Sequence, residues 1–284
     1  MYYSYIILLL GITLLKPYLD LIRAGNCLIA AFGVLIGYLV ATHSFAFNLP
    51  ILLAMISAFL ICAAGQSIND YFDLEVDRKK KTKKPILDFN LNPRNVLIFS
   101  ILLFVLGSKI AFFINPITFE IAVLFSVLLI VYSAFFSKIK YLGNWIVALG
   151  TSFTLIYGAS LVGNYSIVLW FALLALFANV YRELVKDMED IDADKGSKKT
   201  MPMLIGIKNT KYFSFFILLL AFVFSYVPFL LNLANFYYLI AVTFADLIFI
   251  YSILQMKNNN FKKAQQLSKI AMLFGLLAFL VSII

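Results

Sequence analysis

Acidic residues are scarce in this chain and gather in two short segments. Of the 14 Asp and Glu residues, five lie between Asp70 and Asp88 and six between Glu183 and Asp194. The first segment reads N-D-Y-F-D-L-E-V-D-R from position 69, and the second reads D-M-E-D-I-D-A-D-K from position 187. Both fit D-x-x-D-x-x-x-D-[RK]-x₆-P. The shared spacing indicates an internal repeat that supplies two equivalent sites to one cavity.

This spacing suits the binding of a divalent cation. On a helix, positions i, i+3 and i+7 share one face, so the three carboxylates of each segment repel one another unless cations lie among them. Mg²⁺ prefers oxygen ligands and is commonly bound by one or two carboxylates together with substrate phosphate. We therefore expect Mg²⁺ and a diphosphate to be held by Asp70, Asp73, Asp77, Asp187, Asp190 and Asp194.

Two other interpretations of the acids stay open. They could be ordinary solvated loops with mixed charges. They could also belong to a cation transporter, although transport acids tend to lie near the middle of the membrane. Only Asp246 lies deep in an apolar segment.

The elements that would position these acids are membrane helices. Hydrophobic residues make up 63% of the 284 positions and charged residues only 13%, about half the charged fraction of a typical soluble domain. A spanning helix needs roughly 20 apolar residues. We predict an all-α, polytopic bundle of about nine transmembrane helices in a single domain, 1–284, with spans near 19–42, 50–72, 95–114, 117–137, 144–163, 165–185, 212–231, 235–255 and 264–284.

The basic residues predict the orientation of this bundle. Lys and Arg concentrate in the loops 73–94 and 186–211 and near positions 140 and 260, whereas the intervening turns contain none. By the positive-inside rule both acidic segments are cytosolic, in a multi-pass protein of the cell membrane. The net charge of +9 reflects this topology and attraction to membrane lipid, and we expect no nucleic-acid partner. Residues 1–16 are predicted to form an interfacial or re-entrant helix, with a tenth span as the alternative.

Several motifs resemble those of the UbiA superfamily of intramembrane prenyltransferases. The two acidic segments look like its first and second aspartate-rich motifs. The segment 132–140, Y-S-A-F-F-S-K-I-K, followed by Gly-Asn at 143–144, is similar to the family's Y-x-x-x-x-x-K-x-K segment. In the first span, Arg23-x-x-Asn26 resembles the family's R-x-x-N. The resemblance covers most of the chain.

This resemblance implies a UbiA-like fold and Mg²⁺-dependent transfer of a prenyl group from a prenyl diphosphate. The surroundings of the second motif, 182–202, look most like those of archaeal members that add a second geranylgeranyl chain to geranylgeranylglyceryl phosphate, in ether-lipid synthesis. Members with aromatic acceptors, such as those of quinone synthesis, share the motifs and stay an alternative. The implied substrate-binding residues are Arg23, Asn26, Asn69, Arg78, Tyr132, Lys138, Lys140, Arg182 and Lys186.

Overall fold

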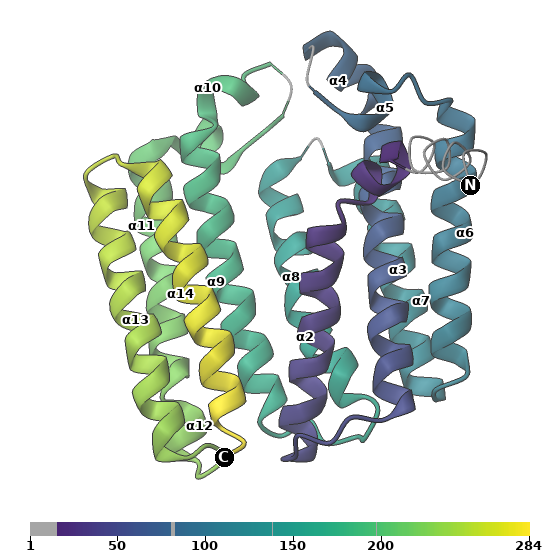
Figure 1. Ribbon diagram of the computed structural model, residues 1–284. Coiled ribbons are helices and arrows are strands. Elements are labelled where there is room, and N and C mark those ends of the chain that lie inside the picture. Colours follow the sequence, from purple (N-terminus) through teal and green to yellow (C-terminus); the bar gives the residue numbers. More distant parts are fainter. Residues whose placement is uncertain (1–15, 81–82, 138, 197) are drawn as a thin grey trace, which may run out of the picture. The chain divides into compact units, whose positions relative to one another are not determined.

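The computed structural model describes residues 16–80, 83–137, 139–196 and 198–284 (Figure 1). Within these ranges every regular element is a helix, which confirms the predicted all-α class. The helix expected over 1–16 lies almost entirely outside the described residues. The elements are α2 Ala24–Thr42, α3 Leu49–Phe72, α4 Leu74–Lys80, α5 Pro85–Asp88, α6 Pro93–Phe112, α7 Pro116–Val131, the π-helix η1 Tyr132–Phe136, α8 Lys140–Ala159, α9 Val168–Glu189, α10 Ile191–Asp194, α11 Met201–Ser225, α12 Val227–Leu230, α13 Phe236–Lys257 and α14 Phe261–Val281.

Nine helical segments in the described part of the chain are long and apolar enough to cross a membrane. Each coincides with a predicted span, so the chain is a multi-pass membrane protein. The seventh differs most, because it begins at Met201 where a loop was expected to continue to position 211. Pro202 stands in its first turn, where the missing N–H costs nothing. Gly206, at φ 80°, is non-helical and kinks the element, so one short helical turn, M-P-M-L-I, precedes the long helical segment.

Asparagine side chains begin many of these helices. At the start of α6, for example, the Asn92 side chain accepts a hydrogen bond from the Arg94 N–H at 2.9 Å, and Pro93 follows the cap. Such a cap satisfies a backbone donor that the helix itself leaves unpaired, which matters in a lipid-solvated protein. Asparagine N-caps of this kind begin α3, α6, α7, α13 and α14, and the capping residues are Asn48, Asn92, Asn115, Asn235 and Asn260.

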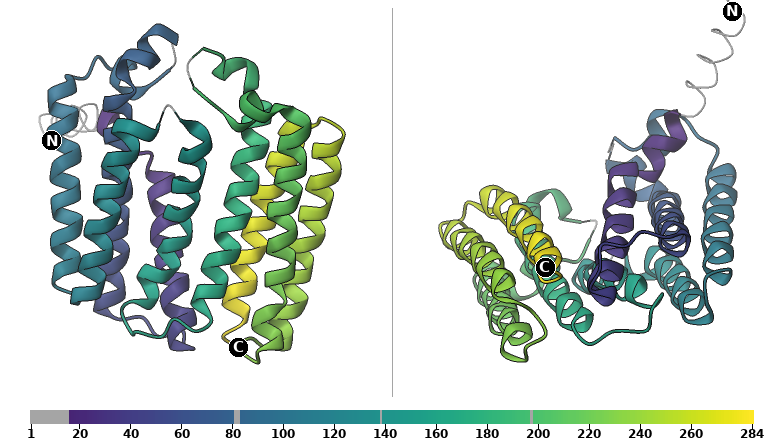
Figure 2. Two further views of the ribbon diagram at one scale, coloured as in Figure 1. Left: turned by 180° about the vertical axis from the view of Figure 1, so that it is seen from behind. Right: turned by 60° about the horizontal axis from the view of Figure 1, so that its bottom comes forward.

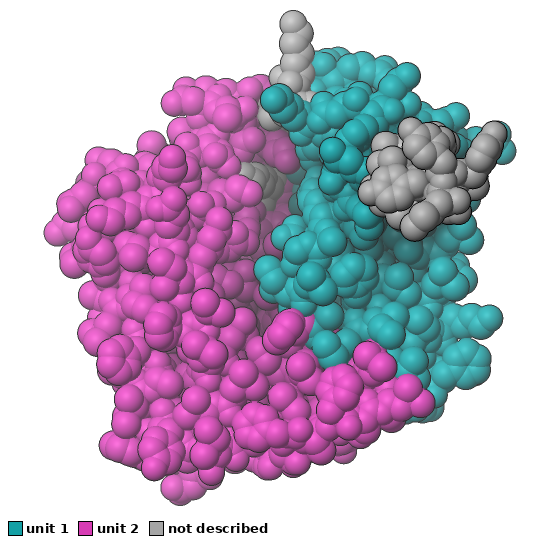
Figure 3. Space-filling model, in the orientation of Figure 1, with its two compact units in different colours: residues 1–31, 53–137 teal, residues 32–52, 138–284 magenta. Residues whose placement is uncertain are grey.

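The chain forms two compact units, coloured separately in Figure 3. Unit 1 comprises residues 1–31 and 53–137, and unit 2 comprises residues 32–52 and 138–284. In unit 1, α6 packs along α7. A buried cluster around Leu21, Ile86 and Val96 joins the segment before α2, the short helix α5 and the start of α6. This cluster anchors the loop that follows the first acidic segment.

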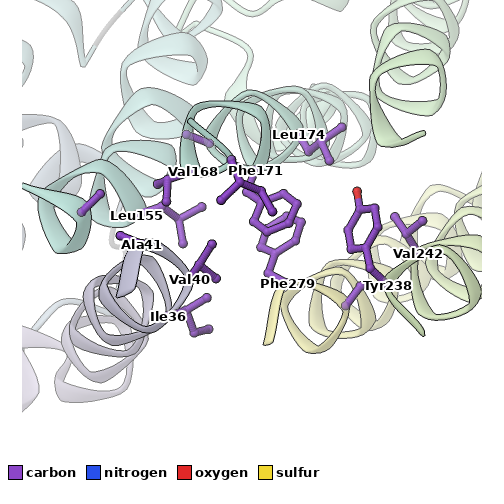
Figure 4. Packing of buried hydrophobic residues seen from close by; sticks show 14 residues of the cluster. Ile36, Val40, Ala41, Leu155, Val168, Phe171, Leu174, Tyr238, Val242 and Phe279 are labelled. Carbon is purple, nitrogen blue, oxygen red and sulfur yellow. The ribbon is translucent and has the colours of Figure 1, made fainter. Parts of the chain in front are cut away.

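Unit 2 is held together by helices that run side by side in both Figure 1 and Figure 2: α9 contacts α8, α11 and α14, and α13 packs along α14. Its largest cluster includes a Phe171 ring that stacks on Phe279, with centroids 4.1 Å apart (Figure 4). Close packing also joins α2 to α8, because a Cβ on Gly37 or Gly158 would overlap backbone atoms of the other helix. Gly33 and Gly37 form a G-x-x-x-G motif, which is typical of such close helix contacts.

Candidate active site

The first acidic segment spans the junction of two helices, and its backbone hydrogen bonds remain helical through that junction. Helix α3 ends at Phe72 and α4 begins at Leu74, with Asp73 between them. The Asp73 N–H nevertheless donates to the Asn69 carbonyl at 2.9 Å, and the Asp77 N–H donates to the Asp73 carbonyl at 2.9 Å. The backbone from Asn69 to Asp77 is therefore helical, which is the geometry in which an i, i+3, i+7 spacing shares one face. We call residues 69–77 the first acidic turn.

The second acidic segment repeats this backbone geometry. Helix α9 ends at Glu189 and α10 begins at Ile191, so Asp190 stands at the break, as Asp73 does in unit 1. The Asp190 N–H donates to the Lys186 carbonyl at 2.9 Å, and the Asp194 N–H donates to the Asp190 carbonyl at 3.0 Å. The repeat inferred from the sequence thus extends to the backbone hydrogen bonds. We call residues 186–194 the second acidic turn.

In the first acidic turn, Asp70 is completely buried and binds two cations of unit 1. Its Oδ1 lies 2.6 Å from Nη2 of Arg23 and 2.9 Å from Nζ of Lys84. Lys84 also lies 3.7 Å from Oδ2 of Asp77, so one ammonium bridges two carboxylates. These cations offset the repulsion between the clustered acids.

The Arg23 guanidinium is itself fixed from two sides. It donates to Oδ1 of Asp70 and, at 2.6 Å through Nη1, to Oε1 of Gln66, which lies one helical turn earlier on α3. The backbone of Arg23 has φ 50°, a left-handed conformation that is uncommon for a residue with a side chain. Such strain persists where surrounding contacts hold it, often at functional sites.

Asp73 is held by uncharged groups. Ser137 Oγ donates to its Oδ1 at 3.1 Å, and Asn69 Nδ2 donates to its Oδ2 at 3.3 Å. Ser137 directly follows η1, where the Ser137 N–H donates to the Tyr132 carbonyl five residues earlier. Single π-turns of this kind are frequent at functional sites because they redirect the side chains that follow them.

In the second acidic turn, Asp187 is completely buried and accepts a 2.8 Å hydrogen bond at Oδ2 from Nδ2 of Asn144. Asp194 is buried as well, whereas Asp190 is half-buried. One turn earlier on α9, the Arg182 guanidinium pairs with the buried Glu183 carboxylate. The second turn therefore also presents buried carboxylates, with Asn144 of α8 as a neutral donor.

The donor atoms fit a hard divalent cation such as Mg²⁺. Within the described residues, Asp70 Oδ2 and Asn69 Oδ1 are buried and have no hydrogen-bond partner. Leaving such oxygens unpaired is costly unless a ligand satisfies them. Among the same described residues, no three acidic, histidine or cysteine side chains are close enough to hold a metal ion by themselves. Mg²⁺ is commonly bound by one or two carboxylates, with water and phosphate as its remaining ligands.

The structure brings several predicted substrate-binding residues to the acidic turns. Arg23 contacts the first turn directly, Asn69 belongs to that turn, and Lys186 belongs to the second. Arg182 is half-buried one turn before Asp187, and Tyr132 anchors the π-turn.

The other predicted residues are either exposed or lie outside the described part of the chain. Asn26 and Arg78 are exposed, and their substrate contacts stay predictions. Lys138 lies outside the described residues, and so does the side chain of Lys140. That the two acidic turns share one ligand stays a prediction.

Sequence reasoning did not single out four residues that contact the acids or their cations. Gln66 lies inside a predicted span, and the other three stand within recognised motifs or loops, but the partners of all four are distant along the chain: Gln66, Lys84, Ser137 and Asn144. Gln66 carried the clearest signal, since it precedes Asp70 by one helical turn. Lys84 was treated only as part of a basic loop.

The nine candidate spans among the described residues and the two clusters of buried carboxylates define a polytopic membrane protein with a repeated acidic motif. The model of the UbiA prenyltransferase family matches residues 30–281, and the chain belongs to this family. The resemblance drawn from the motifs is therefore confirmed.

Curated relatives match almost end to end. Digeranylgeranylglyceryl phosphate synthase of Methanococcus maripaludis strain S2 is 38% identical over 276 residues, which covers 94% of this chain and 98% of the relative. The protein of the same name from Methanosarcina mazei is 37% identical over 287 residues, covering 95% and 99%.

Solved structures share the fold. One, from work on digeranylgeranylglyceryl phosphate synthase in membranes, has a TM-score of 0.83 and 35% identity, covering 95% of this chain and 98% of the other. A UbiA homologue from Archaeoglobus fulgidus bound to GPP and Mg²⁺ has a TM-score of 0.68 at 19% identity, covering 93% and 99%. The latter likeness shows the fold alone.

Proposed function

We propose that this chain transfers a geranylgeranyl group from geranylgeranyl diphosphate to the free hydroxyl of geranylgeranylglyceryl phosphate and releases diphosphate. The observation that carries this proposal is the match, at 38% identity and along nearly the whole of both chains, to relatives that bear the name digeranylgeranylglyceryl phosphate synthase. The reaction belongs to the synthesis of archaeal ether lipids.

The acidic turns supply what the donor requires. Asp70, Asp73 and Asp77 of the first turn and Asp187, Asp190 and Asp194 of the second would hold Mg²⁺, and the buried, unpaired Oδ2 of Asp70 supports this assignment. Bound Mg²⁺ would act as a Lewis acid that stabilises the departing diphosphate by several kcal/mol.

The basic residues beside the turns would bind the diphosphate oxygens. Arg23 and Lys84 already approach Asp70, and each carries further N–H groups that can donate to phosphate. Arg182 and Lys186 would do the same at the second turn. The candidates Lys138 and Lys140 follow Ser137, which contacts the first turn.

The reaction then breaks the bond between C1 of the prenyl group and the diphosphate oxygen, which leaves with the electron pair. The acceptor hydroxyl oxygen forms the new bond to C1 and loses its proton at or after attack, so a strong base is unnecessary. Tyr71, Phe72 and Tyr132 are candidates to stabilise the allylic cation, since an aromatic face contributes roughly 0.5–2 kcal/mol to a nearby cation. A site that excludes water protects that cation from hydrolysis.

Both substrates carry long prenyl chains, so we infer that they enter sideways from the bilayer of the cell membrane, with their charged ends at the cytosolic boundary. The clustering of Lys and Arg in the loops next to the acidic turns supports this orientation.

The cation-transporter alternative is not favoured. It would depend on Asp246, the one acid deep in a predicted span. In unit 2 that carboxylate is buried and accepts a hydrogen bond from Ser225 Oγ at 2.9 Å, while the Ser225 carbonyl accepts from the Tyr238 hydroxyl at 2.7 Å. This arrangement ties α13 to the end of α11 and explains the acid structurally.

The proposal is tested with purified full-length protein in lipid nanodiscs. Geranylgeranyl diphosphate, Mg²⁺ and two acceptors, geranylgeranylglyceryl phosphate and 4-hydroxybenzoate, are supplied together, and both products are quantified by mass spectrometry. We expect only the digeranylgeranyl lipid and an equal amount of diphosphate. Exclusive prenylation of the benzoate would instead establish an aromatic acceptor, and no product with either would reject both assignments.

A further inference from the structure

Two neutral side chains near the acidic turns stand seven positions apart in the sequence. Ser137 ends the η1 turn and contacts Asp73 in unit 1, while Asn144 lies in the first turns of α8 and contacts Asp187 in unit 2. We propose that Ser137 and Asn144 are positioning residues, each of which fixes one carboxylate of one acidic turn for the Mg²⁺–diphosphate complex. This inference rests on the proposed function.

Ser137 reaches Asp73 because of the π-turn. Its hydroxyl lies 3.1 Å from Asp73 Oδ1 and 3.2 Å from the Ser133 carbonyl, and the residue is 3% exposed. The carbonyl four residues earlier is the usual local acceptor for a helical serine. A carboxylate is the stronger acceptor of the two, so the one hydroxyl proton is drawn towards Asp73.

Asn144 performs the equivalent task in unit 2. The residue is 3% exposed, and Nδ2 donates to Asp187 Oδ2 at 2.8 Å, a short and well-placed bond between buried groups. The start of α8 is tied down independently, since the Tyr141 N–H donates to the Lys199 carbonyl at 3.4 Å. Asn144 therefore projects from an anchored helix end.

A neutral donor differs in its effect from a cation. The hydrogen bond orients a carboxylate oxygen but adds no positive charge, so the charge of the acid stays available to a metal ion. Arg23 and Lys84 do the opposite at Asp70, where they bring two positive charges. Donors that orient a metal-binding carboxylate are worth roughly 10-fold to 100-fold in metal affinity or activity when removed.

The test uses the full chain with Ser137→Ala and Asn144→Leu, which remove the donor groups with little change of volume. Ser137→Thr keeps the hydroxyl. The matched controls are Ser133→Ala, whose hydroxyl donates to the Leu129 carbonyl, and Asn164→Leu, whose amide donates to the Ala41 carbonyl. Two quantities are measured: the Mg²⁺ concentration for half-maximal diphosphate release, and the rise in unfolding temperature caused by Mg²⁺ with inorganic diphosphate.

We expect Ser137→Ala and Asn144→Leu each to raise the half-activating Mg²⁺ concentration roughly tenfold or more and to reduce the stabilisation by Mg²⁺ and diphosphate. Ser137→Thr and both controls should stay within about twofold of the natural protein. An unchanged Mg²⁺ response in Ser137→Ala and Asn144→Leu would overturn the inference, even if their unfolding temperatures without ligand were lower. If the natural protein turns over no acceptor, the proposed function fails, while the thermal measurement still decides the positioning role.

Discussion

The two acidic turns have the same backbone hydrogen bonds but different side-chain partners. Asp70 and Asp187 occupy equivalent positions and are both completely buried. Asp70 binds a guanidinium and an ammonium, whereas Asp187 accepts a hydrogen bond from the Asn144 amide. The repeated spacing thus gives the carboxylates equivalent backbone positions in the two turns. The side chains that contact those carboxylates differ between the turns. Equivalent positions in the sequence repeat therefore have contacts of different charge, two cations at Asp70 and a neutral amide at Asp187.

Removal of the metal should have the largest effect, because each turn would lose the cation that we propose it binds. Treatment with EDTA is expected to abolish diphosphate release, and added Mg²⁺ should restore it. The same treatment should leave the helical signal in circular dichroism unchanged, since the spans are stabilised by helix packing rather than by metal. Turnover that persists in metal-free buffer would contradict the ligand assignment for both turns.

Replacing the acid at either helix break should have the next largest effect. Asp73→Ala and Asp190→Ala remove equivalent carboxylates, and each should lower kcat/KM by roughly 100-fold to 1000-fold, which corresponds to the several kcal/mol expected of metal stabilisation. A large loss in one variant and normal turnover in the other would show that only one turn serves the reaction. Normal turnover by both would reject a shared Mg²⁺ site altogether.

The cations of the first turn allow a sharper comparison. Lys84→Met removes the ammonium that bridges Asp70 and Asp77, and kcat/KM should fall roughly tenfold, which is about 1.4 kcal/mol and typical of a hydrogen bond to a charged group. The neighbouring Lys83 is exposed, so Lys83→Met carries the same loss of charge without the contact. Equal effects of the two substitutions would mean that Lys84 acts only through net charge.

The spans and acidic turns could be predicted from sequence because their signals are local. Apolar stretches have the length that a bilayer requires, and the aspartate spacing is legible within eight residues. The partners of the acids are a different matter. Arg23 and Asp70 are 47 positions apart, and Asn144 and Asp187 are 43 apart. Such contacts depend on how helices pack against one another, which hydropathy does not determine.

The start of α11 illustrates a second limit. Lys208 and Lys211 made residues 201–211 look like a loop, yet both lysines are helical in the structure, and only Gly206 departs from helical geometry. Polar side chains at the end of a span can extend towards the interface, so they mark the membrane boundary rather than the helix boundary. The π-turn of η1 was equally invisible, because its residues, Y-S-A-F-F, fit an ordinary apolar helix.

The smallest effects should come from acids that lie within the two segments but outside the repeated spacing. Glu75 and Asp192 are both exposed, and Asp192 forms an ion pair with Lys195, which is exposed as well. Exposed ion pairs contribute about 0–1 kcal/mol. Glu75→Gln and Asp192→Asn should therefore change kcat/KM and the half-activating Mg²⁺ concentration by less than about twofold. Each substitution removes one negative charge next to a proposed metal-binding carboxylate. A substantial loss of Mg²⁺ affinity would therefore show that the turns attract the ion by their total charge, and that the i, i+3, i+7 spacing does not select the ligands.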